Sequence, residues 1–255
     1  MTASAPPLAG KRILVTRPRA QAADLRQKLA ALGAEPIMFP TITIAPLEDT
    51  STLDEAISQL ANYHWIIFTS VNGVAAFWER LQSAEKDGNV LAGIRTAAIG
   101  PATATALEQR GVQARFIPDE YVAEAIVAGI GEVRGQRVLL PRADIAREAL
   151  AIELARRGAR VDEIAAYRTL PATPDPHGLA ELRRGVDAIT FTSSSTVRNF
   201  VALAGRAIGD AVIACIGPIT AQTAREFGLT VDIVASEYTM DGLVAALVDH
   251  FNRSK

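Results

Sequence analysis

The stretch Gly10-Lys11-Arg12-Ile13-Leu14-Val15 decides the fold, because the chain contains a second copy of it. Gly135-Gln136-Arg137-Val138-Leu139-Leu140 follows 125 positions later, with the same Gly-x-Arg start and a similar apolar run. Two further pairs occur in the same order, Phe68-Thr69-Ser70 with Phe191-Thr192-Ser193 and Ile99-Gly100-Pro101 with Ile216-Gly217-Pro218. Three collinear matches with slowly drifting offsets indicate a duplicated unit of about 120 residues.

Each copy alternates short apolar runs with stretches of helical periodicity. Residues 12–15 are typical of a buried strand, and Leu25 and Leu29 then recur at helical spacing over 20–32, with Gly33 expected to end that helix. Further helices are expected through 74–81, from 101 to near 111 and over 121–130. Further strands are expected over 65–68, 96–99, 115–117, around 138, and over 161–165, 186–191, 212–216 and 231–234. This alternation predicts two similar doubly wound α/β domains, each with a parallel sheet covered on both faces.

The residue pattern leaves the boundary between the domains open. One possible cut lies in the middle of the chain, near Val133. Alternatively, the chain crosses twice between domains, at 39–43 and 166–171, where extended segments rich in β-branched and aromatic residues are flanked by proline. The second possibility makes one domain continuous and assembles the other from both ends of the chain.

Composition and charge describe an ordinary globular protein. The 255 residues are 49% hydrophobic and 21% charged, and the net charge is −2. A near-neutral chain without a basic face argues against a nucleic-acid partner. No apolar run approaches the ~18 residues of a membrane span, and residues 1–7 have the features of a short disordered lead-in rather than of a signal peptide. We therefore expect no membrane association and a cytoplasmic location.

The cysteine, histidine and glycine patterns exclude further classes of site. The single cysteine, Cys215, rules out an internal disulfide framework, suits a reducing compartment and is expected in the core. Three widely spaced histidines leave no metal-ligand spacing. No glycine-rich phosphate loop is present. Asp187, Asp210 and Asp232 precede strands, which is the wrong end of a parallel sheet for a ligand site.

Four strand ends carry small hydroxyl or Gly-Pro residues that open a helix. They are 69–73, 100–103, 192–196 and 217–220. A helix start offers unpaired N–H groups and a positive dipole end, which suit an anion. Arg17 and Arg142 follow the first strand of each copy and would add full charges, so two such edges facing each other predict a cleft for a polycarboxylate.

The same residues have a purely structural interpretation. Serine and threonine at helix starts are most often N-caps, and duplication alone could produce their symmetry. Tyr167 lies in a possible crossing between domains, where its ring could plug a hinge or its hydroxyl could point into the cleft. The residue pattern does not choose between these interpretations.

Together these segments resemble the uroporphyrinogen-III synthase family. The resemblance covers nearly the whole chain and rests on Lys11-Arg12-Ile13-Leu14-Val15-Thr16-Arg17-Pro18, Phe68-Thr69-Ser70, Ala166-Tyr167-Arg168-Thr169, Phe191-Thr192-Ser193-Ser194-Ser195 and Ile216-Gly217-Pro218-Ile219-Thr220-Ala221. It implies two similar α/β domains joined by two extended linkers, near 40–43 and 167–171, with a cleft between them. One domain would comprise 1–40 with 171–255, and the other 41–166.

The resemblance also implies a reaction. The substrate would be hydroxymethylbilane, a linear chain of four pyrroles with acetate and propionate groups, and the product uroporphyrinogen III. The terminal hydroxyl would leave to give an azafulvene, and a spiro intermediate would fragment and reclose with the last ring inverted. Because the substrate closes unaided to the wrong isomer, the protein would act by orientation more than by strong acid–base groups. No cofactor or metal is implied.

The resemblance assigns roles to residues at matching positions. Tyr167 matches the family's tyrosine proposed to give a proton to the leaving hydroxyl, and Thr103 and Thr220 match its helix-start threonines. The residues expected to bind substrate are Arg17, Ser70, Thr103, Arg142, Ser193, Ser194, Gly217 and Thr220.

Two other functions are compatible with the residue pattern. A non-catalytic binding module with two lobes could close on an anionic small molecule, although no signal peptide or DNA-binding segment supports an exported binder or a regulator. A nucleotide- or sugar-phosphate enzyme would also suit doubly wound domains, but a glycine-rich phosphate loop is missing. A monomer is expected, because no extra apolar helix face stands out in the pattern.

Overall fold

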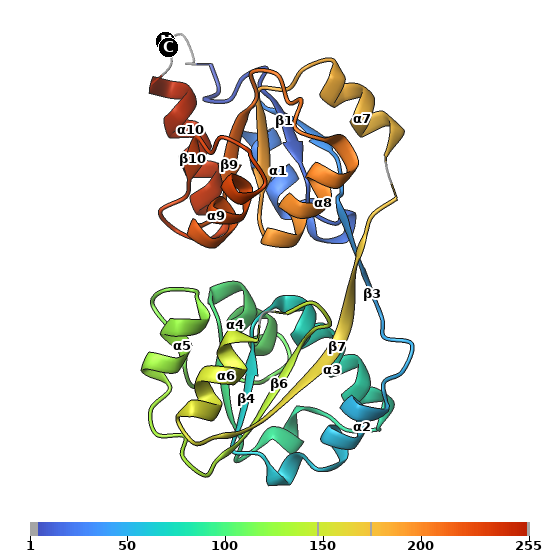
Figure 1. The fold of residues 1–255 in the computed structure, drawn as a ribbon, viewed down its shortest axis with the longest axis vertical. Helices are drawn as coiled ribbons and strands as arrows, with labels where there is room; N and C mark the ends of the chain where they lie inside the picture. Colours follow the sequence, from blue (N-terminus) through green and yellow to red (C-terminus); the bar gives the residue numbers. More distant parts are fainter. Residues whose placement is uncertain (1–4, 147, 174, 254–255) are drawn as a thin grey trace. The chain divides into compact units, whose positions relative to one another are not determined.

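The computed structural model describes residues 5–146, 148–173 and 175–253, and these residues form two compact units. One unit combines Met1–Thr43 with Leu170–Lys255, and the other is Ile44–Thr169. The chain passes from the first unit to the second along β3 (Ile42–Ala45) and returns along β7 (Arg160–Pro171) (Figure 1). Both segments are extended strands rather than irregular loops.

The first unit is built on a sheet of five parallel strands in the order β10-β9-β8-β1-β2. The strands are β1 (Arg12–Val15), β2 (Glu35–Met38), β8 (Ala188–Phe191), β9 (Val212–Cys215) and β10 (Ile233–Val234). The helices are α1 (Ala23–Ala31), α7 (Pro176–Arg183), α8 (Ser194–Ala204), α9 (Pro218–Glu226) and α10 (Met240–Arg253), with a 3-10 turn η1 (Arg19–Gln21). Strands from both ends of the chain therefore share one sheet.

The second unit is built in the same way. Its sheet has the order β3-β7-β6-β4-β5, with parallel pairing of β7 with β6, β6 with β4 and β4 with β5. Its other strands are β4 (Trp65–Phe68), β5 (Arg95–Ala98) and β6 (Arg137–Ala143). Its helices are α2 (Ser51–Ser58), α3 (Val71–Ser83), α4 (Pro101–Glu108), α5 (Ala123–Gly129) and α6 (Ala149–Arg156), with 3-10 turns η2 (Leu60–Asn62) and η3 (Gly88–Leu91).

Each sheet is buried on both faces, which explains its continuous apolar strands. In the first unit, Leu14 packs into a cluster with residues of α7, α8 and α9, whereas Ile13 and Val15 pack with residues of α1 and α10. In the second unit, Phe68 packs with α2, α3 and α4, and Ile67 packs with α5 and α6. The predicted fold class, two doubly wound α/β domains, is therefore confirmed.

Most of the predicted elements are confirmed, and the differences have local causes. Gly33 has φ +85°, as a helix-ending glycine should. The strand expected over 115–117 shrinks to one bridge between Ala97 and Phe116. The lead-in expected over 1–7 lies partly outside the described residues, and its described part is ordered, because the Pro6 carbonyl accepts the N–H of Ala9 at 3.0 Å.

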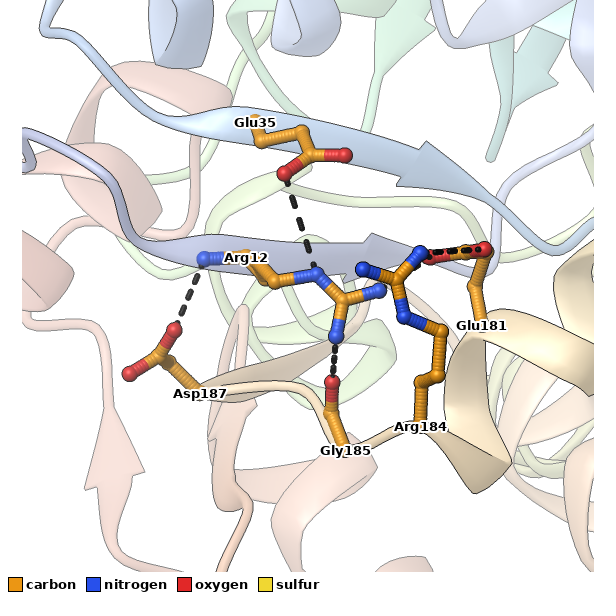
Figure 2. Close-up of polar contacts among 6 residues, drawn as sticks. All are labelled: Arg12, Glu35, Glu181, Arg184, Gly185 and Asp187. Carbon is orange, nitrogen blue, oxygen red and sulfur yellow. Dashed lines mark hydrogen bonds and ion pairs between the residues drawn. The ribbon is translucent and has the colours of Figure 1, made fainter.

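Polar groups at the amino end of the first sheet fasten its strands together. The Arg12 guanidinium bonds the Gly185 carbonyl and the Glu181 carboxylate, and its Nε lies 3.7 Å from Glu35 (Figure 2). The Arg12 N–H donates to Asp187 at 2.8 Å, and the Lys11 ammonium binds the same carboxylate at 2.8 Å. The arginine that opens the repeated motif is therefore structural, and so is Asp187, as its place before a strand predicts.

Asp187→Asn should lower the free energy of unfolding by about 1–2 kcal/mol at pH 7, because it weakens two charge-assisted hydrogen bonds. Burial raises the pKa of Asp187, but the bonds from Lys11 and the Arg12 N–H outweigh it, so the pKa is lower than usual. This contribution is present above the unfolded pKa of about 3.9 and is lost as pH falls through the lower folded value. Urea unfolding between pH 3 and 7 measures it.

The exposed Asp210 provides a matched control, because it also precedes a strand. Asp210→Asn should leave the free energy of unfolding within about 0.5 kcal/mol of the wild type. Equal stability of the Asp187→Asn and Asp210→Asn variants at pH 7 would contradict the fastening role of Asp187.

Candidate active site

The carboxyl edge of the second sheet brings together three residues singled out in the sequence. Ser70 follows β4, Arg142 lies near the end of β6, and Tyr167 lies near the end of β7. The hydroxyl oxygens of Ser70 and Tyr167 are 3.0 Å apart, which is a hydrogen bond. Since these strands are parallel, residues 97 positions apart in the chain meet at one edge.

A β-bulge sets the position of Tyr167. The register of β6 and β7 shifts between Arg142, which pairs with Ala165, and Ala143, which pairs with Tyr167. Ala166 is skipped, so both Ala166 and Tyr167 belong to the same core cluster, which regular alternation along a strand would not allow. The bulge thus turns the tyrosine toward α3 and Ser70, and leaves it only 7% exposed.

Asp144 fastens the strand around Tyr167. Its N–H donates to the Tyr167 carbonyl at 3.0 Å, and its carboxylate accepts the N–H of Thr169 at 3.0 Å. A single residue therefore holds the backbone from the Tyr167 carbonyl to the Thr169 N–H. Nothing in the sequence singled out Asp144 beyond its place directly after an expected strand.

The Ser70 side chain makes two hydrogen bonds at the start of α3. It is the N-cap of α3, and its oxygen accepts the N–H of Gly73 at 2.9 Å while it also bonds the Tyr167 hydroxyl. A Cβ on Gly73 would lie 2.9 Å from the Pro141 carbonyl, so glycine is required for α3 to approach β6. The capping interpretation of Ser70 is therefore confirmed, and it does not exclude a second use.

The environment of Tyr167 favours its neutral, proton-bearing form. Burial raises the pKa of the phenol above its usual value of about 10, while hydrogen bonds with Ser70 and Asn72 and the charge of Arg142 oppose part of this rise. At neutral pH the hydroxyl therefore carries its proton and can donate it. Asn72, in the first turn of α3, lies within the strand end expected over 69–73 but was not among the residues expected to bind substrate.

Arg142 has an internal partner for its charge. Its Nη1 lies 2.6 Å from the Glu163 carboxylate, and the residue is only 8% exposed. The arginine was expected to meet a substrate carboxylate, but the structure pairs it with a carboxylate of the protein. Glu163 was not singled out in the sequence, because its proximity to Arg142 depends on the register of β6 and β7.

Arg17 occupies the corresponding position in the first unit, with different partners. Its Nε donates to the Gln21 carbonyl at 3.1 Å, its Nη2 to the Gln21 side chain at 3.4 Å, and its Nη1 to the Met240 sulfur at 3.6 Å. Burial lowers the pKa of the guanidinium, and the charge of Asp24 opposes this only in part. Among the described residues no carboxylate forms an ion pair with Arg17.

The serines after β8 have internal partners. Ser193 caps α8 and forms a capping box with Thr196, and its hydroxyl lies 2.9 Å from that of Ser195. The Ser194 hydroxyl lies 2.7 Å from that of Thr223, which connects α8 with α9. The capping interpretation therefore accounts for Ser193, and a helix contact accounts for Ser194.

Two Gly-Pro helix starts are built alike. Gly100 and Gly217 are the N-caps of α4 and α9, and a glycine has no side chain with which to cap the first turn. Thr103 and Thr220 are the third residues of these helices and are 4% and 6% exposed. Each edge therefore offers a first turn without a side-chain acceptor, a suitable place for a carboxylate.

Other kinds of site are not apparent in the described part of the chain. No group of three or more metal-binding side chains comes together among the described residues. None of the helices described is long and apolar enough to cross a bilayer. Cys215 is fully buried, and burial raises the pKa of its thiol to about 12, as expected of a core residue.

Comparisons with known proteins agree on one family. Residues 23–245 match the family model described as "Uroporphyrinogen-III synthase HemD". The chain is 38% identical to the uroporphyrinogen-III synthase of Synechococcus elongatus over 253 residues, covering 94% of this chain and 96% of the relative. It is 31% identical to the enzyme of Chlorobaculum parvum, covering 94% and 98%.

Solved structures show the same fold. A mutant uroporphyrinogen III synthase of Thermus thermophilus aligns with a TM-score of 0.68 at 21% identity, covering 96% of this chain and all of that one. The Helicobacter pylori protein described as uroporphyrinogen-III synthetase aligns with a TM-score of 0.60 at 18% identity, covering 94% and 99%.

Ser70→Ala should lower the free energy of unfolding by about 1–2 kcal/mol, because it removes an N-cap and a partner of the buried Tyr167 hydroxyl. In a double-mutant cycle with Tyr167→Phe, the two losses should be non-additive by at least about 0.5 kcal/mol. Denaturant unfolding of the four proteins measures both quantities. Ser83→Ala, at the exposed end of the same helix, is the control. Additive losses would contradict the hydrogen bond between the two hydroxyls.

Proposed function

The chain belongs to the uroporphyrinogen-III synthase family, and from this premise we propose that its substrate is hydroxymethylbilane. It is a cyclising lyase of porphyrin biosynthesis. In the proposed reaction the linear tetrapyrrole loses its terminal hydroxyl as water and closes with ring D inverted, through a spiro intermediate. We further propose that the protein acts as a cytoplasmic monomer.

The reaction places a geometric demand on the protein. The substrate is reactive enough to close unaided, but unaided closure keeps ring D in its original orientation and gives isomer I. Catalysis therefore consists in holding one shape of the chain, and orientation of this kind can supply a large part of a rate enhancement. The protein needs anchors for several carboxylates and one donor for the departing water.

Tyr167 supplies the donor in this proposal. The observation that carries it is the 3.0 Å hydrogen bond between the Tyr167 and Ser70 hydroxyls, at a strand end where burial keeps the phenol protonated. The phenol would give its proton to the hydroxyl as the carbon–oxygen bond breaks, and the departing group leaves as water. Ser70 and Asp144 would act as positioning residues for the ring.

Arg17 and the Gly-Pro helix starts supply the anchors. A half-buried guanidinium with only neutral bonding partners gains a strong interaction when a carboxylate arrives. The first turns of α4 and α9, with Thr103 and Thr220, would bind further carboxylates, as would the backbone of Gly217.

The remaining residues expected to bind substrate have partners within the protein. Ser193 would order the start of α8, Ser194 would connect α8 with the middle of α9, and Arg142 would stabilise the edge through Glu163. The cleft expected between the two domains stays a prediction. The names of the relatives, which are synthases, argue against the binding-module and nucleotide-enzyme alternatives.

Tyr167→Phe should reduce the turnover number about tenfold and leave KM nearly unchanged, because the ring stays and only the donor is lost. The loss is moderate because the substrate is intrinsically reactive. The assay generates hydroxymethylbilane in situ, oxidises the products and separates uroporphyrin isomers I and III. The wild type should give mostly isomer III, and only isomer I from folded protein would refute the proposed function.

The matched control for this experiment is Tyr63→Phe. Tyr63 bonds Asp162 at the opposite end of the same sheet, and its hydroxyl lies outside the proposed site. Its loss should affect stability but not turnover. A turnover number within about twofold of wild type in the Tyr167→Phe variant would remove Tyr167 from the role of donor.

Arg17→Gln should raise KM about tenfold with little change in the turnover number, because a charge-assisted contact to a carboxylate is lost. Arg17→Lys should restore part of this loss, since it keeps the charge but not the forked geometry. Steady-state kinetics at several salt concentrations measure the effect. Arg26→Gln, on the exposed face of α1, is the control. An unchanged KM for Arg17→Gln would exclude a direct contact.

A further inference from the structure

Each unit holds a tyrosine ring against a Gly-Pro helix start. A Cβ on Gly100 would lie 3.0 Å from Cγ and 3.2 Å from Cδ1 of Tyr121, and a Cβ on Gly217 would lie 3.2 Å from Cδ1 of Tyr238. Both glycines have extended backbones, with φ −172° and −175°, which any residue can adopt. A side chain at either position would press on the tyrosine ring, so glycine lets the ring pack closely against the helix start.

The two tyrosines are held by the same kind of backbone turn. The Val122 N–H donates to the Glu120 carbonyl at 2.8 Å, and the Thr239 N–H donates to the Glu237 carbonyl at 2.8 Å. In each case the tyrosine is the central residue of a three-residue turn. The turns lead directly into α5 and α10, so both rings are carried by short, constrained segments rather than by long loops.

Large apolar side chains are exposed at or shortly after several strand ends. Ile117 and Val234, each four residues before its tyrosine, are both 40% exposed. Val71 and Ile145, which follow β4 and β6, are 45% and 49% exposed. Of the six large hydrophobic side chains exposed in the described part of the chain, Val234 ends β10, Ile117 follows the bridge at Phe116, and Val71 and Ile145 come within three residues of a strand end, where a purely ionic site would not need them.

We propose that Tyr121 and Tyr238 are specificity-determining residues that bind pyrrole rings of the substrate. This inference rests on the proposed function and extends it from the carboxylates to the rings. A carboxylate-bearing pyrrole is apolar on its faces and charged at its edge. A half-buried tyrosine beside a helix start matches that division, with its ring for the pyrrole and the helix N–H groups for the carboxylate.

A tyrosine packed on a Gly-Pro helix start occurs once in each unit, so the chain has two proposed ring-binding positions. Two fixed pyrroles would constrain the shape of a four-ring substrate more than carboxylate contacts alone, because a carboxylate on a flexible arm does not fix the plane of its ring. Loss of either position should therefore affect which isomer forms, as well as how tightly the substrate binds.

The test compares alanine, leucine and phenylalanine at both positions. Tyr121→Ala and Tyr238→Ala should each raise KM about tenfold, the size expected when an aromatic stacking partner is removed. They should also lower the fraction of isomer III, which a merely structural role would not change. Phenylalanine should keep KM within about threefold of wild type, because it retains the ring.

The leucine variants test the proposal even if the alanine variants fail to fold. Tyr121→Leu and Tyr238→Leu retain bulk against the glycine but lose the aromatic face, so they should behave like alanine rather than phenylalanine. Circular dichroism verifies folding, and Tyr63→Phe is the control. Folded leucine variants with the KM and isomer ratio of the phenylalanine variants would overturn the proposal.

A second readout separates this proposal from the proposed function. If the wild type yields only isomer I, the proposed function fails, and fluorescence titration with uroporphyrin III, an octacarboxylate porphyrin, then decides the inference. Binding by the wild type that weakens about tenfold in the alanine variants would support tyrosine contacts with pyrrole rings. Absence of wild-type binding, or equal binding by the alanine variants, would overturn them.

Discussion

Burial of both faces of a parallel sheet leaves only its edges for polar chemistry. In each unit helices cover both faces of the sheet, and the polar side chains of the site, such as Arg142 and Tyr167, lie toward the carboxyl ends of their strands. The amino edge is used for fastening, as Arg12 and Asp187 show. The carboxyl edge, where strands end and helices begin with exposed N–H groups, is left for ligands. The site, its charges and its glycines all follow from this constraint.

How far a sequence can predict such a site depends on which contacts are local. Ser70 and Arg142 could be singled out because each comes near the end of a recognisable strand, and Tyr167 because it lies in an extended segment expected to cross between domains. The pairing of Arg142 with Glu163 could not, since it depends on the register between two strands and on a bulge that skips Ala166. The bridge at Phe116, in place of a full strand, likewise reflects pairing partners that no local pattern specifies.

The two copies of the repeat have similar scaffolds but different polar contacts at equivalent positions. Arg17 and Arg142 occupy equivalent places in the repeat, Arg17 shortly after β1 and Arg142 near the end of β6. Among the described residues Arg17 bonds neutral groups, whereas Arg142 pairs with Glu163. The half-buried guanidinium of Arg17 has lost part of its hydration and forms no ion pair within the described residues, so an arriving carboxylate would stabilise it more than it would stabilise a paired arginine. Tyr167 and the Ser70 hydroxyl that it bonds both belong to the second unit. The proposed proton donor Tyr167 and the proposed carboxylate anchor Arg17 thus belong to different copies of the repeat.

The glycine–tyrosine device shows which features both copies share. Between Gly100 and Tyr121, and between Gly217 and Tyr238, the two copies differ at most positions, but both keep a ring packed on an extended glycine. A substrate with several similar rings and many carboxylates needs the same kind of contact at more than one place, whereas a single departing hydroxyl needs one donor. A duplicated scaffold meets both needs when ring and carboxylate contacts are retained in each copy and the proton donor is present in one.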